Sequence, residues 1–428
     1  MFKNINCKNL PSLRRNIVYQ FLYELLIVFI PLFTIPYVSR VLGAENIGLF
    51  SYTYAVANYF VLFANLGIKN YGSRTIAMVR NNKEELNRNF SEILSIHIIF
   101  SIIVIFVYLV LLFFFVEDNL VIFLIQSIYV FAAVFDINWF FFGIEKFKLT
   151  VGRNTLVKIL SVFLVLVFVK TQTDLWIYAL ILALSVFVGQ SVVWFALKQY
   201  VSWRRPSWAN MKQHIRPLFV LFLPILALSL YKYMDKIMLG SISSNVQVGF
   251  YENAEKIINV PMSLIMAFGV VLMPRIANMV TSKDKGEVFK LIDMSMEAVM
   301  LLAIAISFGL AGISFVLAPI FFGYEFEECG ILIMGLAVTV PFMAFANVIR
   351  TQYLIPYKED KIFVVSLFLG AAVNLIVNII LIPYMAARGA VIGTIFAEII
   401  VCIYQSYFVR KKIFIKKYLL NTIPPILI

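Results

Sequence analysis

Two cations and an amide that could hold a phosphate group lie close together at the start of one apolar stretch. Arg153, Asn154 and Lys158 fall within about one and a half helical turns, and Asn154 and Lys158 share a face at four-residue spacing. Arginine presents a planar fork of donors to phosphate oxygens, and lysine supplies a point charge. The group could capture a phosphate-bearing substrate, but the same pattern is typical of cations that anchor a helix at a membrane interface.

Two carboxylates and a tryptophan precede this group. Asp136 and Glu145 bracket the same region of the sequence. They could form ion pairs with the nearby cations or bind a coupling ion, and pairing is the simpler interpretation. Trp139 could stack against a sugar ring, although aromatic residues of a membrane protein mostly face lipid or the interface. We therefore treat all three as candidate site residues.

A second group combines three lysines with three carboxylates on two consecutive apolar stretches. Its members are Lys232, Asp235, Lys236, Glu252, Glu255 and Lys256. A charge at the centre of a bilayer costs roughly 2.5–3.5 kcal/mol on insertion scales, so each member should meet a partner or a wet cavity. The pattern predicts either a cluster of interhelical salt bridges that locks one end of the helices, or a gate or phosphate contact. A gate could be built from the same salt bridges.

Two further carboxylates stand alone in apolar stretches. Glu24 lies near the N-terminus and Glu398 near the C-terminus. A lone carboxylate inside the membrane is a candidate for carrying a proton or a coupling ion. The alternative is that each pairs with a basic residue or faces an aqueous cavity passively.

No recognised catalytic or metal-binding pattern accompanies these residues. The three cysteines, Cys7, Cys329 and Cys402, give neither a disulfide framework nor metal-ligand spacing, and the two histidines are too few for a histidine-based metal site. The sequence contains no Walker A run, no HExxH motif and no glycine-rich phosphate loop. We expect neither an enzyme nor a cofactor or metal.

The elements that must position these residues are membrane-spanning helices. The chain is 62% hydrophobic and only 14% charged, whereas about one quarter of the residues of a soluble domain are charged. Apolar runs long enough to cross a bilayer recur along the whole length. We expect an all-α polytopic membrane protein with twelve spans, at about 17–39, 47–69, 91–116, 120–142, 153–169, 175–197, 217–239, 249–273, 291–321, 330–350, 362–383 and 389–409.

The basic residues predict the orientation of these spans. Of 36 Lys and Arg, 28 fall in alternate loops that include both ends of the twelve-span core, and only three fall in the opposite loops. Loops rich in Lys and Arg stay in the cytoplasm. We therefore place both ends of the core in the cytoplasm, and the net charge of +13 indicates orientation and contact with anionic lipid rather than a nucleic-acid partner.

An internal echo suggests a duplicated six-helix module. Pro31, Gly43 and Gly48 are followed about 200 residues later by a looser copy with Pro224, Gly240 and Gly249. We expect an N-terminal lobe at 1–199, a cytoplasmic linker at 200–216 and a C-terminal lobe with a basic tail at 217–428. Two such lobes, related by a pseudo-two-fold axis along the membrane normal, form a transporter architecture with the substrate between them.

Four stretches resemble the Wzx-type oligosaccharide flippases, in the polysaccharide branch of the multidrug/oligosaccharidyl-lipid/polysaccharide exporter superfamily. They are residues 31–43 (PLFTIPYVSRVLG), 136–148 (DINWFFFGIEKFK), 233–240 (YMDKIMLG) and 249–254 (GFYENA). The resemblance implies a two-lobed, twelve-span fold like that of the multidrug exporters of the superfamily. One departure is Phe142, which stands where the family commonly has a polar residue such as glutamine.

The resemblance also implies the activity and the partners. The cargo would be an oligosaccharide repeat unit of O-antigen or capsule on an undecaprenyl pyrophosphate carrier, flipped from the inner to the outer leaflet of the bacterial cytoplasmic membrane. Alternating access would be coupled to a gradient of H⁺ or Na⁺, and a polysaccharide polymerase and a chain-length regulator are the protein partners to consider. Alternatives are a multidrug/cation antiporter of the same superfamily and a flippase for peptidoglycan-type precursors. A polymerase or ligase would need a large outer loop, which this chain lacks.

Overall fold

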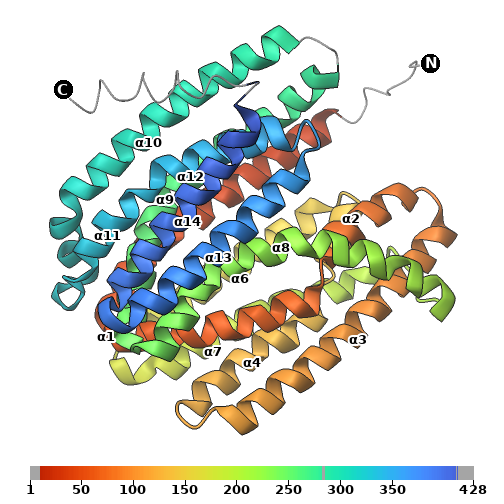
Figure 1. The fold of residues 1–428 in the computed structure, drawn as a ribbon. Coiled ribbons are helices and arrows are strands. Elements are labelled where there is room, and N and C mark those ends of the chain that lie inside the picture. The colour runs from red at the N-terminus through yellow and green to blue at the C-terminus, as the bar shows by residue number, and fades with distance from the viewer. Residues whose placement is uncertain (1–9, 282–284, 411, 413–428) are drawn as a thin grey trace. The chain divides into compact units, whose positions relative to one another are not determined.

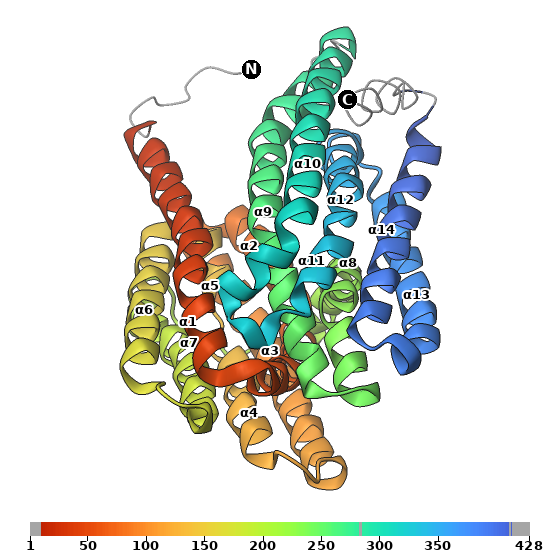
Figure 2. The ribbon, with the colours of Figure 1, turned by 90° about the vertical axis from the view of Figure 1, so that its left-hand side faces the viewer.

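The computed structural model describes residues 10–281, 285–410 and 412, and within these residues every regular element is a helix. Two compact units contain them. Unit 1 comprises residues 10–42 and 53–226, and unit 2 comprises residues 43–52, 227–281, 285–410 and 412. The first and eighth helices contribute residues to both units. Figures 1 and 2 show the helices of each unit.

Unit 1 combines long apolar helices with several short ones. They are α1 (Leu10–Asn65), α2 (Ile68–Val79), α3 (Lys83–Phe115), α4 (Leu120–Val134), α5 (Asn138–Gly143), α6 (Phe147–Phe168), η2 (Gln172–Asp174), α7 (Leu175–Leu197) and the first half of α8 (Trp208–Ile242). Local side chains set some of these boundaries. Asn82 accepts hydrogen bonds from the backbone N–H groups of Glu84 and Glu85 and so caps the start of α3.

Unit 2 likewise consists of helices. They are α9 (Asn245–Thr281), α10 (Lys285–Phe322), η3 (Tyr324–Phe326), α11 (Cys329–Ala337), α12 (Thr339–Val348), the π-helical turn η4 (Ile349–Leu354), α13 (Asp360–Met385) and α14 (Ala387–Val409). The last two lie side by side as an antiparallel hairpin, which Figure 2 shows clearly. The turn between them needs a positive φ at Ala386, which is 48°.

The described helices confirm the all-α polytopic fold that hydropathy predicts. Eleven described segments are long and apolar enough to cross a membrane, and one of them, Leu32–Val79, is 48 residues long. This segment takes in the whole of the second predicted span and the end of the first, with a break at Gly43, where φ is 78° and ψ is 171°. The remaining ten segments correspond one to one with the other ten predicted spans.

The break at Gly43 directs ten residues of the first helix into unit 2. The backbone N–H of Ala44 donates to the Glu325 carboxylate at 2.8 Å. Gly48 lies so close to α9 that a Cβ there would overlap the carbonyl group of Asn245 and approach the Gly249 nitrogen at 2.8 Å. A Cβ at Gly249 would in turn overlap the Ala44 carbonyl oxygen. Glycine at 48 and 249 is therefore required by backbone-to-backbone packing.

The core of unit 1 gathers where α2, α3, α5 and the start of α8 meet. The Trp139 ring is buried and stacks on Phe90 with ring centroids 5.6 Å apart. It also packs against Gly72, where a Cβ would come within 2.6 Å of the ring. Phe140 and Phe141 fill the space beside it. This packing fixes α5, and α5 precedes the first group of candidate site residues.

Candidate functional site

A hydrogen-bonded network in unit 1 joins α5, α6 and α7 through Arg153. Its guanidinium donates from Nη1 to the Gly189 carbonyl oxygen at 2.7 Å and from Nη2 to Asn138 Oδ1 at 3.1 Å. Its Nε donates to Asn154 Oδ1 at 3.0 Å. Asn138 donates its own amide to Gln190 Oε1 at 2.8 Å. The N–H groups of Arg153 are therefore largely bonded to residues of α5, α6 and α7 and hold these three helices together.

Asp136 belongs to the same network. One carboxylate oxygen accepts from the Asn138 backbone N–H at 3.0 Å and from the Asn138 amide at 2.7 Å. These bonds start α5 and orient the Asn138 side chain toward Arg153. Glu145 lies apart from this network and forms an ion pair with Arg80 at 2.5 Å. Of the two carboxylates, only Asp136 thus shares a network with Arg153.

Lys158 differs from Arg153 although it lies on the same helix. It is half-buried, and no ion pair within the described part of the chain includes it. Its ammonium group therefore keeps donors and charge that an anion could use. Trp139, by contrast, points into the core of unit 1 with its ring 2% exposed. A sugar contact by Trp139 stays a prediction, and in this structure its ring packs only against the core.

A compact salt-bridge cluster in unit 2 contains four of the six charges in the second group. The buried Lys236 ammonium lies 2.5 Å from Glu252 and 2.8 Å from Glu255, and Lys256 lies 3.1 Å from Glu252. Two cations and two anions balance, so the cluster joins α8 to α9 without net charge. Lys232 lies outside it, exposed, with its ammonium 5.4 Å from the centre of the Tyr233 ring.

Asp235 is the centre of a separate polar cluster in unit 2. It is buried, and it accepts hydrogen bonds from Tyr251 at 2.6 Å, from Asn378 at 2.5 Å and from Thr394 at 3.0 Å. Asn378 also donates to Asn374 Oδ1 at 3.1 Å. No Lys or Arg among the described residues forms an ion pair with Asp235, so three uncharged helix partners hold its carboxylate.

This cluster presents several oxygen atoms in one buried place. The Asp235 carboxylate, Asn374 Oδ1 and Thr394 Oγ1 take part in the bonds above, and Asn378 Oδ1 is buried with no hydrogen-bond partner. A hard monovalent or divalent cation takes such carboxylate, amide and hydroxyl oxygens as ligands. A carboxylate in this setting can equally accept a proton. The arrangement can therefore hold a cation that balances the buried negative charge.

The uncharged members of this cluster were not predicted from the sequence. Asn374 and Asn378 are four residues apart on α13 and lie in a strongly apolar span, and this spacing was the available signal. Tyr251 and Thr394 carried no such signal. Glu398 lies one turn beyond Thr394 on α14 and is 5% exposed. Glu24 is on α1, but its side chain lies outside the described part of the chain.

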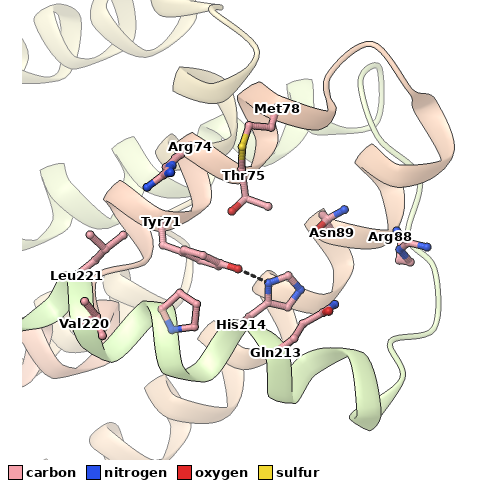
Figure 3. A pocket seen from close by; sticks show the side chains of 11 residues that line it. Tyr71, Arg74, Thr75, Met78, Arg88, Asn89, Gln213, His214, Val220 and Leu221 are labelled. Atoms are coloured by element: carbon pink, nitrogen blue, oxygen red, sulfur yellow. Dashed lines mark hydrogen bonds between the residues drawn. The ribbon is translucent and has the colours of Figure 1, made fainter.

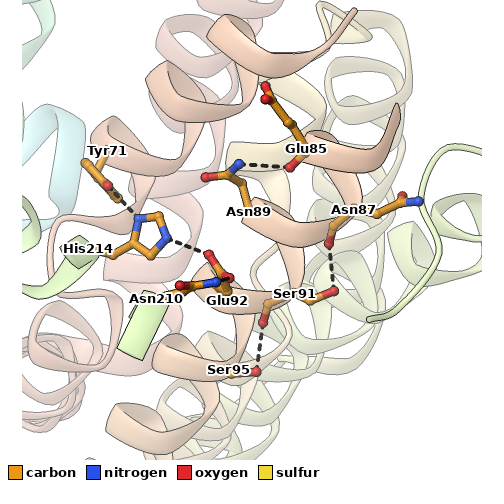
Figure 4. Close-up of polar contacts among 9 residues, drawn as sticks. All are labelled: Tyr71, Glu85, Asn87, Asn89, Ser91, Glu92, Ser95, Asn210 and His214. Atoms are coloured by element: carbon orange, nitrogen blue, oxygen red, sulfur yellow. Dashed lines mark hydrogen bonds and ion pairs between the residues drawn. The ribbon is translucent and has the colours of Figure 1, made fainter. Parts of the chain in front are cut away.

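A second missed network lies at the start of α3 and α8 in unit 1. His214 Nε2 is 3.0 Å from Glu92 Oε2, and His214 Nδ1 is 2.6 Å from the Tyr71 hydroxyl. Asn210 donates to the other Glu92 oxygen at 3.0 Å. Figure 4 shows these side chains converging from α2, α3 and α8. Both His214 and Glu92 are buried, so the network fixes three helices against one another.

The segment between α7 and α8 is attached to the same part of α3. The backbone N–H of Ser202 donates to Asn87 Oδ1 at 3.0 Å, and that of Arg204 donates to Ser91 Oγ at 2.9 Å. Ser91 and Ser95 in turn donate to carbonyl oxygens one turn back in α3, which Figure 4 also shows. The segment between α7 and α8 is therefore fixed to α3 by hydrogen bonds.

Comparison with known proteins gives relatives over nearly the whole chain. A "Putative O-antigen transporter" of Shigella dysenteriae is 24% identical over 408 residues, which is 92% of this chain and 99% of that protein. A protein of the same name from Escherichia coli (strain K12) is 26% identical over 409 residues, 94% of this chain and 98% of that protein.

Solved structures share the fold. The lipid II flippase MurJ in an inward closed conformation matches with a TM-score of 0.73 at 16% identity, covering 94% of this chain and 89% of that chain. An inward-facing MATE transporter of the MOP superfamily matches with a TM-score of 0.69 at 14% identity, covering 91% and 97%. The family description "Polysaccharide biosynthesis protein" matches residues 13–280, more than half of the sequence. The resemblance seen in the sequence is confirmed, and the chain belongs to the polysaccharide biosynthesis protein family.

Proposed function

We propose that this protein flips a lipid-linked oligosaccharide across the bacterial cytoplasmic membrane for surface polysaccharide assembly. The observation that carries the proposal is the match, over more than nine-tenths of the chain, to two relatives named as O-antigen transporters. The cargo would be a repeat unit on an undecaprenyl pyrophosphate carrier, moved from the inner to the outer leaflet. Charged and polar clusters inside the apolar helices of both units support transport over a purely structural role.

In this proposal, Lys158 receives the diphosphate and Arg153 positions the helix that bears it. The half-buried ammonium of Lys158 has no ion pair among the described residues, whereas the Arg153 guanidinium is bonded to Gly189, Asn138 and Asn154. A cation without a partner attracts an anionic head group at little cost, because no existing pair has to be broken. Asn154 and Asp136 support the geometry around Arg153.

The Asp235 cluster would carry the coupling ion. Its buried carboxylate and the neighbouring Asn374, Asn378 and Thr394 oxygens suit H⁺ or Na⁺. Binding of either ion would neutralise Asp235 and change its bonds to α9, α13 and α14, which are packed together in unit 2. The Lys236–Glu252–Glu255–Lys256 cluster lies on the next residues of α8 and α9 and would serve as a gate that breaks and reforms.

Complementation of a strain that lacks its O-antigen flippase tests the proposed function. Expression of this chain should restore surface polysaccharide if the protein accepts the sugar unit of that strain. Without a functional flippase, repeat units should accumulate on the carrier at the inner leaflet. A parallel strain depleted of its lipid II flippase separates the two cargo classes. Rescue of cell-wall synthesis without surface polysaccharide would contradict the proposal.

A further inference from the structure

A cavity of about 620 Å³ lies within unit 1, where α2, α3 and α8 come together. Figure 3 shows the side chains that line it. They are Tyr71, Arg74, Thr75, Met78, Arg88, Asn89, Gln213, His214, Pro217, Val220 and Leu221. Its volume falls in the range of about 300–1,000 Å³ that small-molecule sites occupy. None of the side chains assigned to flipping or coupling above lines it.

The wall of the cavity is rigid because its polar groups bond to one another. Tyr71 and His214 meet at 2.6 Å, and His214 meets the buried Glu92 at 3.0 Å. The Glu92 carboxylate is satisfied by His214 and Asn210, so its charge is not directed into the cavity. The wall thus fixes the shape of the cavity and leaves recognition to other side chains.

Two arginines provide the charge of the cavity. Arg74 and Arg88 are exposed, and neither forms an ion pair within the described part of the chain. Nearby arginines do find carboxylates, since Arg80 pairs with Glu145 at 2.5 Å and Arg204 pairs with Glu84 at 3.4 Å. Figure 3 shows Arg74 and Arg88 on opposite sides of the cavity, with Thr75 and Asn89 between them. The cavity therefore offers two separate positions for an anion.

One side of the lining is apolar and exposed. Met78 is 68% exposed and Val220 is 59% exposed, and Leu221 and Pro217 continue the same side. Val220 lies in the predicted span 217–239, and exposed apolar side chains in such a position can contact acyl chains. The ligand that fits is amphipathic, with anionic groups at the arginines and hydrocarbon along α8.

We propose that this cavity binds an acidic membrane phospholipid that carries two phosphate groups, one for each arginine. A diphosphatidylglycerol has this chemistry, because its two phosphates are separated by a glycerol. Basic pockets between membrane helices are a known setting for such head groups. A bound lipid of this kind would connect α2 to α3 through its phosphates and rest its chains on α8. The proposal does not depend on the nature of the transported cargo.

The test is a lipid titration of the full chain in detergent, followed by native mass spectrometry. The probes are tetraoleoyl cardiolipin, dioleoyl phosphatidylglycerol and dioleoyl phosphatidylcholine, with the two acidic lipids compared at equal phosphate. Cardiolipin should bind most tightly and phosphatidylcholine least. The double variant Arg74→Gln, Arg88→Gln should bind cardiolipin at least about 10-fold more weakly, because charge-assisted contacts to phosphate are lost. Each single variant should lower the affinity for cardiolipin toward that for phosphatidylglycerol.

The matched control is the double variant Lys198→Gln, Arg205→Gln. It removes the same charge from two exposed cations that do not line the cavity, and it should leave cardiolipin binding unchanged. Equal loss in the control and the cavity variant would overturn the proposal, because the binding would then reflect overall charge. Equal affinity for cardiolipin and phosphatidylglycerol would also overturn the proposal. So would displacement of cardiolipin by glycerol 3-phosphate at matched phosphate, because the hydrocarbon chains would then contribute nothing to binding. All the substituted residues are exposed, so the variants should fold.

Discussion

Two cations on one helix differ because of what their neighbours offer. Arg153 has a carbonyl oxygen and two amide oxygens within reach, and its guanidinium is bonded to all three. Lys158, a turn and a half further along α6, forms no ion pair with any residue whose side chain the structure describes. The proposed roles of the two residues, positioning for Arg153 and diphosphate binding for Lys158, rest on this difference.

We predict that Lys158→Gln abolishes most flipping at normal membrane abundance, while Lys158→Arg retains much of it. A lost charge-assisted contact is worth roughly 1.5–3 kcal/mol, so binding of the diphosphate should weaken about 10- to 150-fold. Surface polysaccharide, normalised to membrane protein, is the measurement. Lys198→Gln, which removes an exposed cation elsewhere, is the control. Full surface polysaccharide from Lys158→Gln would remove this residue from the substrate path.

A second residue-scale prediction concerns Asp235 and Na⁺. If Na⁺ is the coupling ion, the purified protein should unfold at a higher temperature in NaCl than in choline chloride, since a ligand that binds only the native state stabilises it. Asp235→Asn keeps the shape of the side chain but should abolish the difference. Glu328→Gln, which loses only an exposed ion pair with Arg388, should keep it. A Na⁺-dependent shift that survives Asp235→Asn would show that the ion binds elsewhere.

The residues of the two clusters were unequally visible in the sequence. Charged side chains in apolar runs stand out, because each must find a partner or water, and Lys236, Glu252, Glu255 and Lys256 were identified on that basis. Asn378 and Thr394 could not be recognised in the same way. An amide or hydroxyl can satisfy itself on its own helix, so its role depends on which helices meet, and that is decided by tertiary packing.

At the scale of elements, hydropathy predicted which segments are helical, but it did not predict where one helix runs on through a predicted loop. Ten of the twelve predicted apolar runs each have their own counterpart among the described segments that could cross a membrane, and the segment Leu32–Val79 contains the second run and the end of the first. A backbone in lipid has to satisfy its own hydrogen bonds, which favours helices at all these runs. The predicted spans end at 39 and begin again at 47, whereas α1 continues through this stretch and departs from helical angles at Gly43. That residues 43–52 pack with α9 depends on close backbone approach at Gly48 and Gly249, which no periodicity encodes.

We predict that Gly48→Ala destabilises the protein, whereas Gly152→Ala does not. A Cβ at position 48 would overlap the Asn245 carbonyl, and forcing extra atoms into packed structure costs about 1–3 kcal/mol. A Cβ at position 152 would meet nothing within 4 Å, and alanine in a helix is favoured over glycine by roughly 0.5–1 kcal/mol. The measurement is the thermal unfolding midpoint in detergent. Equal midpoints for Gly48→Ala and the unsubstituted protein would contradict the close packing of α1 on α9.

At the scale of the whole molecule, the distribution of Lys and Arg predicts the topology. In a variant without Cys7, Cys329 and Cys402, a cysteine at Asn119 should react with an impermeant thiol reagent added to intact cells. A cysteine at Ser207 should react only after the membrane is permeabilised, because the 200–216 linker is expected in the cytoplasm. Both positions are exposed in the structure, so access through the protein is not limiting. Labelling of position 207 in intact cells would reverse the orientation.

The path of the chain through Gly43 has a consequence for how this protein could be divided. A gene cut within the linker gives an N-terminal fragment that still carries residues 43–52, which belong to unit 2. Neither fragment is then a complete folding unit. The C-terminal fragment lacks residues 43–52, which contact Gly249 and Glu325, and the N-terminal fragment leaves these residues exposed. Two separately translated halves should therefore accumulate only when made together. If this chain arose by duplication, an ancestral protein with one module would have needed the segment equivalent to residues 43–52 from a second copy of itself.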